Sequence, residues 1–71
     1  MKRPKLYDSK GEELNEGDLV QLKSGGAEMT IQDFWKKEGT WVATCTWQDM
    51  LHNKEFGSYI PTSLIKLSVS S

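Results

Sequence analysis

The stretch LKSGGAEMTI, residues 22–31, places two adjacent glycines between two short apolar runs. Glycine adopts positive φ at little cost, so Gly25 and Gly26 allow the chain to reverse at this point. A phosphate-binding loop would instead lead its glycines into a helix N-terminus, usually with a lysine after them. Here a β-type run follows, and Glu28 would repel an anion. The stretch therefore predicts a bend between two paired strands.

The runs on either side of this bend alternate between apolar and polar residues, as expected for strands with one buried face. The inward positions would be Val20 and Leu22 before the bend and Met29 and Ile31 after it. A second alternating run places Trp41, Ala43, Cys45 and Trp47 on one face and Val42, Thr44 and Thr46 on the other. The first set carries the large rings and the thiol, which favours it as the core face. No window sustains a helical stripe, so we predict an all-β protein.

Turn residues divide the rest of the chain. Asp8 to Gly11 has turn chemistry that would bring Tyr7 opposite Leu14 in a small hairpin, and Lys36 to Gly39 predicts a second reversal. A further strand is expected from Phe56 to Ile60, where Gly57 would permit a bulge or close packing. A single helical turn follows near Pro61 to Leu64, with Thr62 or Ser63 as its cap. The pattern predicts about five antiparallel strands and one short helical turn.

The length of 71 residues is sufficient for one domain with a small core. The single cysteine excludes an internal disulfide, which favours a reducing, cytoplasmic location, and no apolar run has the length of a signal peptide or a membrane span. From Asn15 onward, five lysines stand against seven acidic residues. This balance gives no electrostatic attraction to nucleic acid.

The reactive residue types show no catalytic pattern. Cys45 has only apolar or hydroxyl neighbours along its strand, so a structural thiol is favoured over a nucleophile. One histidine, His52, and one cysteine on different elements do not make a zinc site. The carboxylates Asp33, Asp49 and Glu55 lack the burial that general-acid catalysis requires. We therefore expect no enzyme activity, no cofactor and no metal site.

The aromatic residues are the better indication of function, because seven of them exceed what so small a core accommodates. Phe34 and Trp35 are adjacent on a strand and so point to opposite faces. Whichever faces outward is a candidate anchor for a partner, since exposed aromatic residues are typical of binding hot spots. The candidate binding residues are Phe34, Trp35, Trp41 and Tyr59. The expected partner is a protein or peptide; the alternative is a nucleic acid whose bases stack on these rings.

The run GD-x-V-x-L-K-S-G-G-x-x-M-T, the triplet Cys45-Thr46-Trp47 and Leu64 with its apolar neighbours resemble the YodC-like family of small uncharacterised bacterial proteins. The resemblance spans roughly residues 15–67. It implies a compact SH3-like barrel and no catalytic residues. The preceding run DSKGEELNEGD is similar to a lead-in of small phage and prophage β proteins. We thus expect an N-terminal hairpin or extension at 1–14, a barrel at 15–67 and a flexible tail at 68–71.

Overall fold

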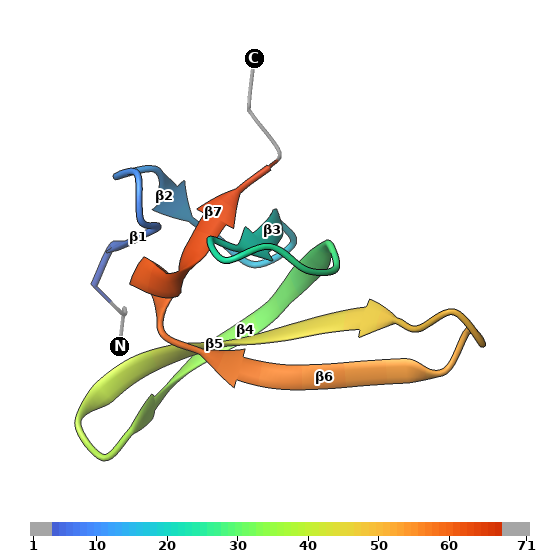
Figure 1. Ribbon diagram of the computed structural model, residues 1–71. Coiled ribbons are helices and arrows are strands. Elements are labelled where there is room, and N and C mark those ends of the chain that lie inside the picture. The colour runs from blue at the N-terminus through green and yellow to red at the C-terminus, as the bar shows by residue number, and fades with distance from the viewer. Residues whose placement is uncertain (1–3, 68–71) are drawn as a thin grey trace.

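The computed structural model describes residues 4–67 of the chain. Its elements are β1 (Leu6–Tyr7), β2 (Glu13–Leu14), β3 (Leu19–Leu22), β4 (Met29–Lys37), β5 (Thr40–Gln48), β6 (Lys54–Tyr59), the 3-10 turn η1 (Pro61–Ser63) and β7 (Leu64–Lys66). The first two strands form a hairpin, and the other five form one antiparallel sheet in the order β6-β5-β4-β3-β7 (Figure 1). The predicted all-β class, its five antiparallel strands and its short helical turn are confirmed. The predicted tail at 68–71 lies outside the described residues.

The order of the five strands brings the last strand, β7, beside β3, the first strand of the sheet, with the 3-10 turn immediately before β7. This is the arrangement expected of a small SH3-like barrel. In Figure 1, β4 runs between two parts of the fold. The elements β1, β2, β3 and β7 gather at one end, and the β5–β6 hairpin extends away from them.

The stretch at residues 22–31 forms the predicted bend. β3 and β4 pair in antiparallel fashion with Val20 opposite Met29. Gly25 and Gly26 adopt φ values of 103° and 113°, a region that side-chain-bearing residues rarely occupy. The N–H of Gly25 donates a hydrogen bond to the carbonyl oxygen of Leu22 at 2.8 Å, which closes the turn. The glycine pair therefore serves the fold by reversing the chain.

A β-bulge in β4 changes the alternation of its side chains. The pairing of β4 with β5 shifts between Ile31, which lies opposite Cys45, and Asp33, which lies opposite Thr44. The extra residue in the bulge lets both Ile31 and Phe34 face the core, although they are three positions apart. Trp35 consequently projects from the other face of the sheet.

The core is formed by Leu14, Val20, Met29, Ile31, Ala43, Cys45 and Leu64, with Leu22, Phe34, Trp47 and Tyr59 packed against it. The predicted inward residues of β3, the start of β4 and most of β5 are confirmed. Trp41 is the exception: it is half-buried outside this cluster, with the Lys36 ammonium 5.8 Å from its ring centroid. It lies near the β4–β5 turn, where the sheet extends past the core.

Three local predictions need correction. Leu14 pairs with Leu6, one residue away from the predicted Tyr7. The 3-10 turn has Ile60 as its N-cap without a side-chain cap, while the Ser63 hydroxyl donates to the Ile60 carbonyl oxygen at 2.7 Å. β6 itself ends at Tyr59. Of the two roles predicted for Gly57, the structure shows close packing: a Cβ there would lie 3.0 Å from the Tyr59 hydroxyl oxygen.

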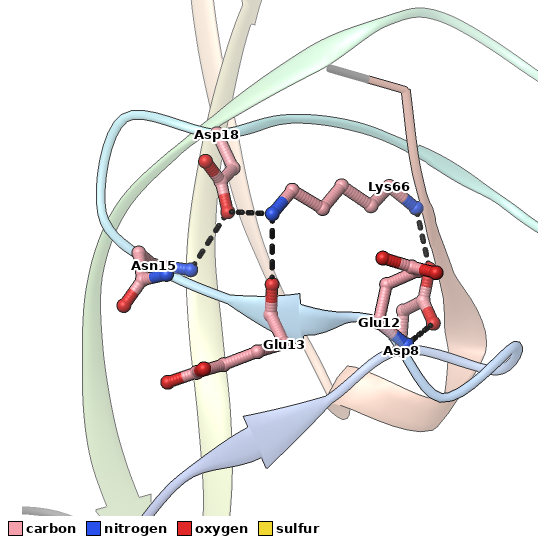
Figure 2. Close-up of polar contacts among 6 residues, drawn as sticks. All are labelled: Asp8, Glu12, Glu13, Asn15, Asp18 and Lys66. Carbon is pink, nitrogen blue, oxygen red and sulfur yellow. Dashed lines mark hydrogen bonds and ion pairs between the residues drawn. The ribbon is translucent and has the colours of Figure 1, made fainter. Parts of the chain in front are cut away.

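The side chain of Asp8 is buried and connects the N-terminal hairpin to β7. Figure 2 shows its hydrogen bonds to Glu12 and Lys66. One carboxylate oxygen accepts hydrogen bonds from the N–H groups of Lys10 and Glu12, both at 2.8 Å. The other oxygen accepts from the N–H of Lys66 at 2.7 Å. The N–H of Ser9 adds a bond to the carbonyl oxygen of Leu64 at 2.9 Å. These bonds cover the outer edge of β7.

The Lys66 side chain provides a second connection between the hairpin and β7 (Figure 2). Its ammonium donates to the Glu13 carbonyl oxygen at 3.0 Å and lies 3.4 Å from a carboxylate oxygen of Asp18. The same Asp18 oxygen accepts from the N–H of Asn15 at 2.8 Å. The backbone of Lys66 thus binds one aspartate and its side chain binds another.

We expect the Asp8→Asn protein to lose roughly 2–3 kcal/mol of unfolding free energy at pH 7, since an amide in place of the carboxylate weakens charge-assisted bonds. Burial alone would raise the pKa of Asp8, but the N–H donors of Lys66, Glu12 and Lys10 outweigh it and lower the pKa below the usual 3.8. Because the pKa of Asp8 is lower in the folded than in the unfolded state, the charged carboxylate stabilises the protein above pH 3.8. This stabilisation is lost as the pH falls through the folded-state pKa.

Urea denaturation of the wild-type and Asp8→Asn proteins at pH 7 and at pH 3 measures the loss of unfolding free energy and its dependence on pH. The exposed Asp33→Asn protein is the matched control, and it should retain wild-type stability at pH 7. Equal stability of the Asp8 and Asp33 variants at pH 7 would contradict the role assigned to Asp8.

Candidate functional site

The face of β4, β5 and β6 opposite the core, here called the outer face, carries a shallow groove. Its volume is about 710 Å³, and it is lined by Thr30, Gln32, Thr44, Thr46, Lys54, Glu55 and Phe56. Threonine methyl groups and the Phe56 ring supply apolar surface, while the hydroxyl and amide groups supply hydrogen-bonding capacity. The two charged residues of the lining have opposite signs, so the groove has no net formal charge.

Trp35 is held in a defined position on the outer face. Its indole N–H donates a hydrogen bond to the Thr44 hydroxyl at 2.9 Å, and Thr44 also lines the groove. The Trp35 side chain remains 40% exposed. Directly across the ladder, Val42 is buried although it does not belong to the core cluster. Trp35 and Val42 therefore form a small apolar area on the outer face beside the groove. The hydrogen bond to Thr44 fixes the orientation of the Trp35 indole in this area.

Of the four sequence-predicted binding residues, only Trp35 lies on the outer face. Phe34 and Tyr59 stand on either side of Ala43 in the sheet and pack against the core. Trp41 has the same facing as Ala43, two positions along β5, and is half-buried. The structure thus separates Trp35 from the other three, and it answers the question of which member of the Phe34-Trp35 pair faces outward.

Phe56 is the residue of this surface that the sequence analysis did not single out. It lies opposite Thr46 in the β5–β6 ladder and is 76% exposed. Its position between Lys54 and Ser58, each two residues away, was the available signal, because residues two apart in a strand share a face and these neighbours make that face polar. From the strand spacing and the rise per residue, Phe56 and Trp35 lie roughly 16 Å apart across the sheet.

The reactive groups of the described chain are positioned as follows. Cys45 is fully buried in the core, and burial raises the pKa of its thiol to about 11, so it is protonated at neutral pH. Asp49 has its pKa lowered, chiefly by the N–H of Asn53, and it serves as the acceptor of the β5–β6 turn. Among residues 4–67, no three His, Cys, Asp or Glu side chains are grouped so that they could hold a metal ion.

Hydropathy gives one further observation on the described part of the chain. None of its helical segments has the length and apolar character that a membrane-spanning helix requires.

Comparison with known families identifies one match. The model of a family described as "Uncharacterized small protein (DUF2158)" matches residues 15–64, which include β3 to β6 and the groove. No curated protein and no solved structure shows significant similarity to the chain. The matched segment contains Trp35, Thr44 and Phe56, and it begins after the hairpin that carries Asp8.

We expect Cys45 to be unreactive toward a thiol reagent such as DTNB at pH 8 while the protein is folded, because the thiol is both inaccessible and protonated. The absorbance of the released thiolate should rise only after urea is added to unfold the chain. Rapid labelling of the folded protein, at the rate of the unfolded one, would show an accessible thiolate and would contradict the buried position.

Proposed function

From the premise that the chain belongs to the DUF2158 family of uncharacterized small proteins, we propose that it is a non-catalytic interaction module. It binds a protein or peptide segment through the outer face of its sheet. The observation that carries this proposal is the pairing of an oriented, exposed indole with a groove: Thr44 holds the Trp35 ring and lines the groove together with Phe56. An aromatic side chain that is fixed before binding loses little conformational entropy on contact with a partner.

The dimensions of the surface suit an extended peptide. The separation of roughly 16 Å between Trp35 and Phe56 corresponds to about five residues of extended chain. A segment that lies diagonally across β4, β5 and β6 could place one apolar side chain on each ring from positions four apart, which point to the same side of an extended chain and lie about 13 Å apart. The threonine and glutamine side chains between them, such as Thr44, Thr46 and Gln32, can bond to its backbone. We propose a peptide with two apolar anchors and little net charge as the ligand.

Several finer assignments rest on the sequence and belong to the same proposal. They are kinship with the YodC-like proteins of bacteria, a phage-like or prophage-like lead-in before residue 15, and a cytoplasmic location. The run GD-x-V-x-L-K-S-G-G-x-x-M-T supports the kinship, the run DSKGEELNEGD supports the lead-in, and the single cysteine supports the location. The absence of catalytic chemistry is likewise a proposal, supported by the buried, protonated thiol of Cys45.

A peptide-display selection against the folded protein tests the proposal. We expect selected peptides to perturb the backbone NMR signals of β4, β5 and β6, and we expect Trp35→Ala to weaken binding at least about tenfold, as for a hot-spot aromatic. The matched control is Tyr7→Ala, because Tyr7 is a comparably exposed aromatic (46%) on the N-terminal hairpin. Equal affinity of the wild-type and Trp35→Ala proteins would exclude the outer face as the binding site.

The alternative of nucleic-acid binding is tested with single-stranded and duplex oligonucleotides at low salt. We expect no binding, since the segment from Asn15 onward has five lysines against seven acidic residues and gives no favourable counterion release. A fluorescence-anisotropy titration at two salt concentrations measures it. Salt-sensitive binding that Phe56→Ala abolishes would replace the peptide ligand with a stacked nucleic acid.

A further inference from the structure

The two edges of the five-stranded sheet differ in how they are protected. At one end, the outer edge of β7 is covered by the N-terminal hairpin through Asp8 and Ser9. At the other end, β6 pairs with β5 on one side, and within residues 4–67 no strand pairs with its other side. Figure 1 shows the β5–β6 hairpin extending away from the rest of the fold. An unpaired edge presents backbone N–H and carbonyl groups that a further strand can bind.

The hydrogen-bonding pattern identifies which residues of β6 face the open edge. The N–H of Asp49 donates to the carbonyl oxygen of Asn53 at 3.0 Å. These two residues therefore form a hydrogen-bonded pair, from which the bonded pairs of the β5–β6 ladder can be counted. Since bonded and non-bonded pairs alternate in an antiparallel ladder, the residues that bond to β5 are Glu55, Gly57 and Tyr59. The residues whose N–H and carbonyl groups face outward are therefore Lys54, Phe56 and Ser58.

β6 has few of the features that usually prevent edge pairing, such as charges, a proline or a bulge. Its charged residues, Lys54 and Glu55, stand at one end, and the segment from Phe56 to Tyr59 is uncharged. Pro61 follows only after the strand has ended, and the register with β5 is regular throughout. The centre and the far half of the strand are thus open to a partner.

We propose that β6 pairs with β6 of a second copy of this chain, antiparallel and about a two-fold axis at Phe56. This register places Phe56 opposite Phe56 of the partner subunit and Lys54 opposite Ser58 of the partner subunit. All of these residues have outward-facing backbone groups, and no like charges are directly opposed. A shift of two residues in one direction would set Glu55 against Glu55 of the partner subunit, which is unfavourable. The Phe56 register is therefore self-complementary, as a two-fold interface requires.

The same two-fold axis would bring together the exposed apolar residues around β6. Met50 and Leu51, at the tip of the β5–β6 turn, are 96% and 79% exposed, and Ile60 is 47% exposed. His52 and Ile60 lie four residues before and after Phe56, about 13 Å in each direction along an extended strand. The two-fold axis thus brings the tip of each copy beside Ile60 of the partner subunit. Pairing covers the most exposed apolar side chains of the described chain at both ends of the interface.

The tip is already ordered for this contact. One carboxylate oxygen of Asp49 accepts hydrogen bonds from the N–H groups of Leu51 and Asn53, each at 2.9 Å. The turn therefore holds Met50 and Leu51 in the solvent without the support of the core. This inference goes beyond the proposed function, because peptide binding uses the outer face and self-pairing uses the edge. In the pair, the outer faces of the two copies form one continuous surface.

Sedimentation equilibrium of the peptide-free protein, at concentrations up to about 1 mM, tests the pairing. We expect a reversible monomer–dimer equilibrium. Ser58→Pro removes an N–H that faces the edge and leaves the bonds to β5 intact, so it should abolish the dimer. Phe56→Lys places two like charges across the axis and should weaken the dimer at least about tenfold, with partial recovery at high salt. Tyr7→Lys is the control for a surface charge elsewhere and should dimerise as wild type does.

Amide hydrogen exchange provides a measurement that does not depend on variants. The N–H groups of Phe56 and Ser58 should exchange more slowly as the concentration of the wild-type protein rises, while the N–H of Gly57, bonded within the chain, should not change. A wild-type protein that stays monomeric, a dimer that survives both β6 variants, or growth into longer assemblies would each overturn the proposal. Because no peptide is present, these results are independent of whether the outer face binds one.

Discussion

The buried carboxylate of Asp8 is the constraint on which the remainder of the fold depends. It accepts three backbone N–H groups, two from its own hairpin and one from Lys66, nearly sixty residues later in the chain. Without this link, the hairpin would be held to β7 only by the bond from Ser9 to Leu64 and by the Lys66 ammonium, and Leu14, which the hairpin contributes to the core, would be less firmly supported. A carboxylate is well suited to this position, because it has only acceptor sites and every neighbour offers a donor. The first and last strands of the described chain are thereby held together.

The same constraint makes the sheet asymmetric. Since the hairpin occupies the outer side of β7, the open edge of the sheet lies at β6, and the most exposed apolar side chains lie on the β5–β6 hairpin. The exposed fractions of Met50, Leu51 and Phe56 follow from this arrangement, because the β5–β6 hairpin extends past the small core and has nothing to pack against. The groove occurs on this same part of the sheet. The fold thus divides the molecule into an end whose sheet edge is covered and an end whose sheet edge is open.

The sequence was sufficient for the class of the fold and for most of the core. Glycines with turn chemistry and strict alternation predicted the bend after Leu22 and the burial of Cys45, because both depend on neighbours in the chain. The sequence did not predict the bulge in β4. From Ile31, alternation alone would have sent Trp35 into the core and Phe34 outward, and the single extra residue reverses both. A bulge depends on the pairing with β5, which local pattern does not specify. The sequence therefore predicted four candidate aromatic residues and left open whether Phe34 or Trp35 faces outward.

The placement of Trp35 shows how a domain with a minimal core can leave an aromatic side chain exposed in a fixed orientation. Every large apolar side chain facing inward is needed for stability in so short a chain, so an exposed aromatic has to come from residues that the core does not use. The bulge provides one by moving an indole to the solvent, and the Thr44 hydroxyl keeps it in place without burying it. Phe56 is exposed for a different reason, since its side chain lies on the outer face of β6 while Tyr59 of the same strand packs against the core. Both rings are therefore exposed because the core does not use them, and the bond from the Trp35 indole to Thr44 fixes the orientation of one of them.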